Sequence, residues 1–307
     1  MEKIIMDEIG VVIVTYNRLE KLKKAIHSYE CQIIQPIYIL VINNACTDGS
    51  SEYLKKWKDT PESLGYKTGI RRYTITMPSN VGGSGGFYQG LCTAGNLDAK
   101  WIFISDDDAY PNSDVFYIFN QFITDYKGQF AALCTSVICN EQIDTWHRRR
   151  MIRKMGFYVE HKISSDEYRG PFFKVDLYSF VGSLICIDTL RAAGLPLKDY
   201  FISYDDSEHS LRLRKLGDIL CIPAAITIHD TNAPTVAFSW KTYYTVRNKL
   251  LTYKKHFPVY NFSLLCVYYL IRAIKKEKRE RNMVVSAVID AITEKTGIHP
   301  VYQPGWK

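Results

Sequence analysis

Three consecutive carboxylates, Asp106, Asp107 and Asp108, directly follow the apolar run WIFIS. Adjacent carboxylates repel one another, so this arrangement is costly unless a cation lies among them. Asp106 and Asp108 are separated by one residue, and their side chains can therefore face one divalent ion together. Carboxylate oxygens suit Mg²⁺ or Mn²⁺, which also bind phosphate oxygens. The triplet predicts a metal-assisted phosphate site, although Asp-x-Asp also occurs by chance in loops and helix caps.

A second acidic cluster, SYDDSE, spans residues 203–208 and precedes a segment with helical spacing. Asp206 is a candidate general base that would take a proton from a hydroxyl group. The competing interpretation is that Asp206 only caps the following helix. His229 ends the apolar run ILCIPAAITIH and is a candidate metal ligand through a ring nitrogen, although a lone histidine is more often structural.

The segment NVGGSGGF, residues 80–87, has the glycine density of a backbone that a ligand approaches closely. As a dinucleotide-binding fingerprint it is weak, because no acidic residue ends the following strand at the usual spacing. The lysine of a P-loop is also missing. A dehydrogenase and a P-loop phosphotransferase are therefore disfavoured.

The elements that would position these groups alternate between strand and helix over the first hundred residues. Strands are predicted at 10–14, 37–43, 71–78 and 101–105, and residues 19–30 show helical spacing of leucine and isoleucine. This alternation predicts an α/β fold with a doubly wound sheet. Ligands bind such sheets at the carboxyl ends of the strands, where the polar clusters described above lie.

Beyond Asp230 the chain becomes basic, rich in tyrosine and helical in pattern. We therefore expect a catalytic domain over residues 1–230 and a helical extension over residues 231–307. Between Lys241 and Arg281, eleven basic residues accompany only two acidic ones. Such a patch favours an anionic partner, whether acidic lipid, nucleic acid or a diphosphate, but it also fits a solvated basic helix.

The apolar segment 257–274 is shorter than the roughly 20 residues that a membrane-spanning helix needs. Two interpretations stay open. One is an amphipathic helix lying on an acidic membrane face. The other is a helix in the core or at a dimer contact, so a homo-oligomer is among the open states.

The opening residues, MEKIIMDEIG, include acidic side chains where a secretory leader needs a continuous apolar core, so a leader is not expected. The eight cysteines are scattered without a CxxC pair, which disfavours a disulfide or metal framework. A reducing, cytoplasmic compartment is predicted.

Taken together, the motifs resemble family 2 glycosyltransferases with the GT-A fold, over roughly residues 10–250. The nearest likeness is to the galactofuranosyl- and rhamnosyltransferase branch of bacterial polysaccharide synthesis. Six segments and one dipeptide carry the resemblance: VVIVTYNR (11–18), VINNACTDGS (41–50), NVGGSGGF (80–87), ISDDDAYP (104–111), SYDDSEHSLR (203–212), YYTVRN (243–248) and Ile228-His229.

The resemblance implies a role for each matching position. Asp206 would be the catalytic base, and Asp106, Asp108 and His229 would hold Mn²⁺ or Mg²⁺. Tyr204, Asp205 and Glu208 would bind the acceptor. The nucleotide sugar would be bound by Thr15, Arg18, Asn43, Asn80, Gly82, Gly83, Asp106 and Asp107. Asn43 departs from the family, which has an aspartate reading the base there, and this leaves UDP or dTDP open.

The implied reaction is an inverting transfer from a nucleotide-diphosphate sugar to a saccharide, with galactofuranose favoured and dTDP-rhamnose as the alternative. The expected acceptor is lipid-linked, at the inner face of the plasma membrane. A sugar nucleotidyltransferase would need a glycine-rich, arginine-bearing loop after the first strand, where this chain reads TYNRLEKL. A non-catalytic scaffold that binds nucleotide sugars is a further alternative. Nucleic-acid binding lacks any recognisable module.

Overall fold

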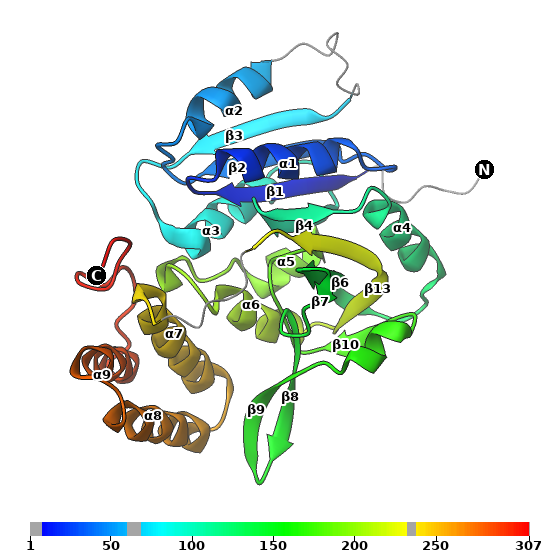
Figure 1. The fold of residues 1–307 in the computed structure, drawn as a ribbon. Coiled ribbons are helices and arrows are strands. Elements are labelled where there is room, and N and C mark those ends of the chain that lie inside the picture. The colour runs from blue at the N-terminus through cyan, green and yellow to red at the C-terminus, as the bar shows by residue number, and fades with distance from the viewer. Residues whose placement is uncertain (1–7, 60–68, 232–237, 307) are drawn as a thin grey trace.

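A computed structural model of the chain describes residues 8–59, 69–231 and 238–306. Residues 1–7, which hold most of the segment that argued against a secretory leader, lie outside the described residues. The remaining parts form a central sheet with helices on both faces and a group of helices at one end (Figure 1).

The first half of the sheet is parallel, as the alternating pattern predicts. It consists of β1 (Ile9–Thr15), β2 (Tyr38–Asn43), β3 (Arg71–Thr76) and β4 (Trp101–Asp106), in the order β4-β1-β2-β3. β1 and β2 are buried along their whole length, which explains their unbroken β-branched and apolar sequences. Their carboxyl ends share one edge of the sheet.

The second half makes the sheet mixed. β12 (Ser183–Cys186) runs antiparallel between β4 and β6 (Phe130–Cys139), and β13 (Asp218–His229) lies parallel to β6. Because β12 opposes both of its neighbours, β4, β6 and β13 point the same way. The carboxyl end of β13 therefore lies at the same edge as that of β4. Short strands complete the sheet: β5 (Ala109–Pro111), β7 (Gln142–Ile143) and β10 (Phe173–Val175).

Helices cover both faces of the sheet, so the doubly wound prediction is correct. One face packs against α1 (Leu19–Glu30), α2 (Ser50–Asp59) and α4 (Val115–Asp125). The other packs against α3 (Gly82–Ala94), α5 (Ile187–Ala193) and α6 (Asp205–Leu213). Two short 3₁₀ turns, η2 (Ser165–Arg169) and η3 (Lys198–Tyr200), lie in the connections.

A separate three-stranded sheet carries the basic segment around residue 150. β8 (Arg148–Lys154) pairs with β9 (Phe157–Lys162) as a hairpin and with β11 (Leu177–Tyr178). Arg148 is fully buried and donates to the carbonyl oxygens of Thr135, at 2.9 Å, and Val181, at 2.7 Å. This arginine ties the base of the hairpin to the main sheet, while the tip projects away from it (Figure 1).

Three helices, α7 (Trp240–His256), α8 (Val259–Ile274) and α9 (Lys278–Ile292), gather beside α6 at one end of the molecule (Figure 1). They form their own apolar cluster, which also takes in Tyr200 and Phe201. The expected domain boundary at residue 231 adjoins residues 232–237, which lie outside the described residues, and the division stays a prediction. Within the described ranges, no helix has the length and apolar character to cross a bilayer.

Glu208 of α6 joins the sheet domain to α7. Its side chain is fully buried, and its carboxylate lies 2.8 Å from Arg212, 2.8 Å from Lys255 and 2.9 Å from His256. Burial by itself would raise the pKa of Glu208, but hydrogen bonds from His256 and Lys255 and the charge of Arg212 hold that pKa at about 2. The carboxylate is therefore a charged link between two helices.

Replacing Glu208 by glutamine should weaken this link. Because the pKa of Glu208 is lowered from 4.5 to about 2 on folding, its stabilising effect is present above pH 4.5 and lost as the pH falls towards 2. Glu208→Gln should lower the free energy of unfolding by about 3 kcal/mol at neutral pH. The difference from the parent protein should shrink as the pH falls, which denaturant titrations at several pH values would measure.

Glu294→Gln is the matched control, because Glu294 pairs with Lys254 but is 68% exposed. Exposed ion pairs contribute little, so its unfolding curve should match that of the parent protein. If Glu208→Gln lowers the free energy of unfolding as much near pH 2 as at neutral pH, an ionised Glu208 is not what links the two helices.

Candidate active site

A cavity of about 680 Å³ opens at the carboxyl ends of β1, β4 and β13. Nine of the residues predicted from the sequence line it: Arg18, Asn80, Gly82, Gly83, Asp106, Asp108, Asp205, Asp206 and His229. Five others do not: Thr15, Asn43, Asp107, Tyr204 and Glu208. The sheet edge thus brings together acidic groups that are far apart in the sequence.

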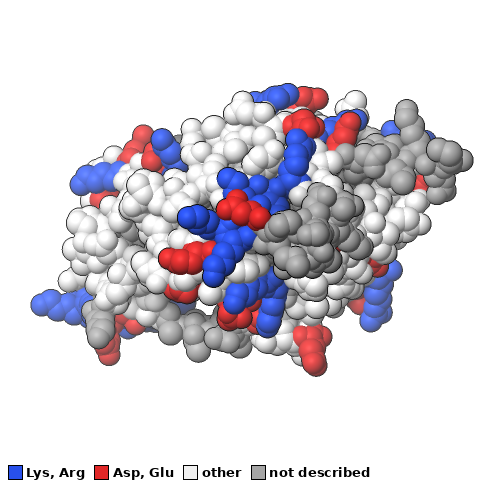
Figure 2. All heavy atoms as spheres, turned by 90° about the horizontal axis from the view of Figure 1, so that it is seen from above, with Lys and Arg blue, Asp and Glu red and all other residues white. Residues whose placement is uncertain are grey.

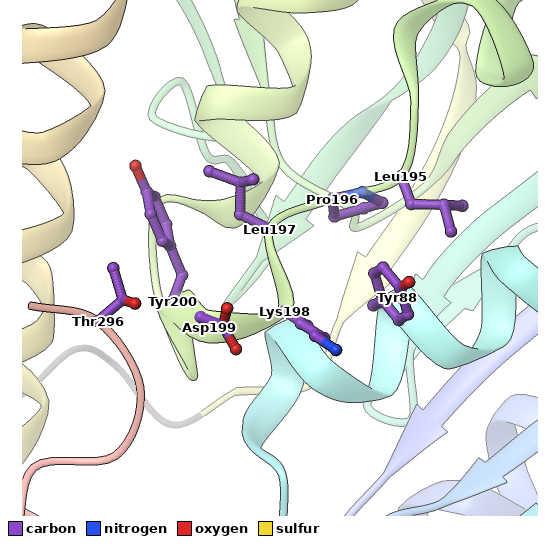
Figure 3. Close-up of a pocket in the computed structure, with 8 residues that line it drawn as sticks. All are labelled: Tyr88, Leu195, Pro196, Leu197, Lys198, Asp199, Tyr200 and Thr296. Atoms are coloured by element: carbon purple, nitrogen blue, oxygen red, sulfur yellow. The ribbon is translucent and has the colours of Figure 1, made fainter.

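A smaller cavity of about 430 Å³ lies between α3 and the segment before α6. Figure 3 shows Tyr88, Leu195, Pro196, Leu197, Lys198, Asp199, Tyr200 and Thr296 around it. None of the residues predicted from the sequence to do chemistry lines this cavity, so it is not the candidate active site.

Asp107 directly follows β4 and bonds to residues at the end of β1 and just beyond it. It is fully buried, accepts a hydrogen bond of 2.6 Å from the Thr15 hydroxyl and pairs with Arg18 at 2.8 Å. Arg18 also contacts Asp108. Burial raises the pKa of Asp107 to about 7, against the charge of Arg18. Thr15 and Asp107, both predicted to touch the donor, therefore lie one layer behind the cavity wall and hold Arg18 in it.

Asp106, Asp108 and His229 form a cluster that suits a divalent cation. One ligand atom from each lies within 4.8 Å of the others, and His229 Nε2 is 3.3 Å from Asp108 Oδ1. Burial, and then the charge of Asp108, raises the pKa of Asp106 to about 6. Two carboxylates and one imidazole are a donor set that fits Mn²⁺ or Mg²⁺.

The other ring nitrogen of His229 faces His147. The distance from His229 Nδ1 to His147 Nε2 is 3.3 Å, and His147 Nδ1 lies 2.6 Å from the Ser179 hydroxyl. Burial pushes the pKa of His147 far below its usual value, so its ring is neutral. Burial lowers the pKa of His229, but the hydrogen bond to Asp108 and the charges of Asp108 and Asp106 outweigh it and raise that pKa, so the aspartates favour the charged ring. His229 would bind a cation through Nε2 after losing the proton there, with Nδ1–H directed at the neutral His147.

His229 also belongs to a second group of possible metal ligands. Cys139 Sγ lies 3.8 Å from His229 Nδ1, and Cys139, His147 and His229 have ligand atoms within 4.8 Å of one another. Sulfur and nitrogen donors suit a softer ion such as Zn²⁺. Only the group with Asp106 and Asp108 offers the oxygens that hard cations bound to phosphates prefer.

Asp205 and Asp206 begin α6 and face the same cavity. Burial, and then the charge of Asp206, raises the pKa of Asp205 to about 8. Burial also raises the pKa of Asp206, while Arg149 opposes this rise. The Asp206 carboxylate lines the cavity and accepts from the Ser207 backbone N–H at 2.5 Å. The N-cap of α6 is Tyr204 and Asp206 lies inside the first turn, so the alternative that Asp206 caps the helix is wrong.

The loop before these aspartates is strained. Phe201, Ser203 and Tyr204 have φ values of 65°, 68° and 68°, a left-handed region that bulky residues rarely adopt. The Asn248 amide donates to the carbonyl oxygens of Tyr200, Ile202 and Ser203 at 2.9, 2.9 and 2.8 Å. The YYTVRN motif of α7 therefore holds the loop that positions Asp205 and Asp206.

Gly82 allows α3 to approach this loop. Its φ is +73°, and a Cβ atom there would lie 1.9 Å from the Phe201 carbonyl oxygen. The same oxygen accepts from the Ser84 backbone N–H at 3.1 Å. The first glycine of the GGSGG run is thus required by the protein's own packing as well as by its place in the cavity wall.

The structure places Asn44, rather than the predicted Asn43, at the cavity. Asn43 is buried, donates to Ser51 at 2.8 Å and accepts from the Cys46 backbone N–H at 2.9 Å. Asn44 lines the cavity and donates to Asn80 Oδ1 at 3.0 Å. The chain leaves β2 at this point, so strand alternation gave no signal for choosing between neighbouring asparagines.

Tyr204 is not part of the cavity wall. Its hydroxyl donates to Glu160 on β9 at 2.9 Å, and Glu160 also pairs with Arg149 and with Lys249, the latter at 3.0 Å. The sequence did not single out either Glu160 or Arg149. It also missed the cavity residues His147, Ser179, Phe180, Trp240 and Lys241, since no motif marks them.

Solved structures share this fold. Staphylococcus aureus TarS, residues 1–349, in complex with UDP-GlcNAc superposes with a TM-score of 0.60 at 12% identity, covering 93% of this chain and 81% of that one. GalNAc-T7 with UDP, GalNAc and Mn²⁺ gives 0.60 at 12% identity over 95% and 57%. The mannosyltransferase PcManGT of Pyrobaculum calidifontis, with GDP-Man and Mn²⁺, gives 0.55 at 11% identity over 94% and 88%. The fold is of the GT-A type.

Two curated relatives are named galactofuranosyltransferase GlfT1. The Mycolicibacterium smegmatis protein is 26% identical over 209 residues, which are 67% of this chain and 65% of its own length. The Mycobacterium tuberculosis protein is 27% identical over 214 residues, 69% and 66% of the two lengths. Each match spans slightly less than two thirds of the relative. Residues 10–193 match the description "Glycosyl transferase family 2", and the chain belongs to this family of glycosyltransferases.

Proposed function

We propose that this glycosyltransferase moves galactofuranose from a UDP-sugar to a saccharide acceptor, with inversion and with the help of a divalent cation. The observation that carries the proposal is the convergence of Asp106, Asp108, His229 and Asp206 on one cavity. Such a cavity offers a cation site for a diphosphate and, beside it, a carboxylate for a hydroxyl group.

Galactofuranose is favoured because the curated relatives carry that name. The structural neighbours were solved with UDP-GlcNAc, UDP or GDP-Man, which supports a nucleotide-sugar donor. dTDP-rhamnose remains the second candidate donor. The Asn44 amide bonds to Asn80 Oδ1, the Gly82 carbonyl and the Val81 backbone N–H, so it supports the cavity wall. The Asn80 amide nitrogen, at the same wall, can donate to the edge of a pyrimidine base.

Asp106, Asp108 and His229 would hold the cation, and two structural neighbours were solved with Mn²⁺. When bound, a divalent ion neutralises charge that develops on the leaving diphosphate. The neutral His147 supports this role, because it can accept a hydrogen bond from His229 Nδ1 and would leave Nε2, which faces Asp108, to bind the cation. Arg18, at the mouth of the same cluster, adds a fixed positive charge for the phosphates.

Asp206 would remove the proton from the acceptor hydroxyl, whose oxygen attacks the anomeric carbon as the bond to the diphosphate breaks. One displacement without a covalent intermediate inverts the anomeric centre. Burial raises the pKa of Asp206 above that of a free carboxyl, which strengthens it as a base. Asp205 lies beside it, and Tyr204 supports the same turn through Glu160.

The acceptor we propose is a lipid-linked saccharide at the inner face of the plasma membrane. Residues 231–307 would form the extension that completes the site, since Trp240 and Lys241 line the cavity. A non-catalytic scaffold is the alternative from another class. The buried acidic groups at the cavity argue against it, because they are costly to keep without a ligand or a reaction.

Asp206→Asn should lower kcat about 10²- to 10⁴-fold, because the amide cannot accept the proton. Donor affinity should stay within a few-fold of the parent value, since the metal cluster is unchanged. Asp199→Asn is the matched control, because Asp199 is exposed and outside the catalytic cavity. Steady-state kinetics with donor and acceptor would measure both. Near-normal turnover of Asp206→Asn would exclude Asp206 as the base.

Calorimetric titration of the parent protein with UDP-galactofuranose, UDP-galactose, UDP-glucose and dTDP-rhamnose should show the tightest binding for UDP-galactofuranose. A chelator should weaken it at least tenfold, and Mn²⁺ should restore it. Asp108→Asn should bind the donor equally weakly with and without Mn²⁺. Tightest binding of dTDP-rhamnose would favour the alternative donor, and Mn²⁺-independent affinity would refute the cation site.

A further inference from the structure

The helix α8 is apolar on two opposite sides. One side, with Phe262 and Cys266, is buried in the cluster that α8 shares with α7 and α9. The other side exposes Leu264, Val267 and Ile271, and Ile271 is 57% exposed. A surface helix normally places polar side chains on its outer face. The outer face of α8 therefore has the composition of a contact surface.

This apolar face continues onto the tip of the β8–β9 hairpin. The Tyr260 hydroxyl donates to the Gly156 carbonyl at 3.1 Å, and the Tyr260 ring packs edge-on against Phe157 with centroids 5.7 Å apart. Met155, at the tip, is 90% exposed. Figure 1 shows the hairpin and α8 on the same side of the molecule. We define the α8–hairpin surface by Met155, Leu264, Val267, Tyr268, Ile271 and Ile274, all exposed.

Positive charge borders both ends of the α8–hairpin surface. Arg153 and Lys154 are exposed beside Met155, and Lys275 and Lys278 are exposed just beyond α8. The helix itself contains no aspartate or glutamate between Val259 and Ile274. Glu277 is exposed beside Lys278, so the charge beyond α8 is mixed, with basic residues in excess. The side of the molecule seen in Figure 2 also has acidic side chains among the basic ones. An excess of positive charge thus borders the apolar surface.

We propose that the α8–hairpin surface docks on a lipid bilayer that carries acidic headgroups, with α8 lying in the plane of the interface. Apolar side chains would enter the boundary between headgroups and acyl chains, while the flanking lysines and arginines contact anionic lipid. A second copy of the chain fits less well. Pairing two such surfaces would place the basic ends of one copy against the apolar face or the basic ends of the other.

Sedimentation of the full chain with vesicles tests this proposal without donor or acceptor, so failure of the proposed transfer would not affect the result. The chain should bind vesicles that contain phosphatidylglycerol and bind phosphatidylcholine vesicles much more weakly. Ile271→Glu should lower the partition coefficient about tenfold or more, since one buried isoleucine is lost. Lys275→Gln should lower it about fivefold.

Ile33→Glu is the matched control, because Ile33 follows α1 and is 63% exposed, similar to Ile271. It should bind vesicles like the parent protein. Circular dichroism melting verifies that each variant folds, and Val267→Ser provides a second, milder change on the same face. The proposal is overturned if the parent chain ignores acidic vesicles or if Ile33→Glu weakens binding as much as Ile271→Glu. It also fails if sedimentation velocity shows a dimer that Ile271→Glu dissociates.

Discussion

Burial of acidic groups at one edge of the sheet is the constraint on which the site depends. Asp106, Asp107 and Asp205 each have a pKa raised by burial, so the fold keeps carboxylates where they are hard to ionise. Such a site is stable only because the strands and helices around it hold the groups in place. The protein supplies part of the compensation through Arg18 and His229, and a bound cation would supply more. A cation held among these carboxylates would in turn attract a diphosphate.

The C-terminal helices also hold the acidic turn in place. The turn before Asp205 and Asp206 adopts backbone angles that non-glycine residues avoid, and it cannot hold them unaided. Asn248 satisfies three of its carbonyl groups, and Glu208 fastens α6 to α7 through Lys255 and His256. Helix α7 therefore helps to shape the cavity, because the geometry of the acidic turn depends on hydrogen bonds from α7.

Local patterns were enough to predict the parallel half of the sheet and the doubly wound layers, and together with the family resemblance they predicted nine of the residues that line the cavity. Strand ends carry their polar residues to one edge, whereas the grouping of His229 with Asp106 came from the family resemblance. Side-chain direction after a strand could not be predicted, because alternation stops there; hence Asn44 rather than Asn43 lines the cavity. Glu208 looks like an acceptor ligand in sequence, yet α7, far along the chain, buries it. Motifs locate an edge, whereas tertiary contacts decide which side chains face the cavity.

The β8–β9 hairpin contacts both the acidic turn and α8. Glu160 on β9 binds Tyr204 and Arg149, which lie beside Asp206, and the tip of the same hairpin packs on α8 through Tyr260. The paired strands β8 and β9 therefore link the outer part of α8 to the acidic turn through one element. An acceptor anchored in a bilayer must present its reactive hydroxyl at a set height above the lipid. If the α8–hairpin surface docks on lipid and Asp206 is the base, as proposed, the hairpin would help to set that height.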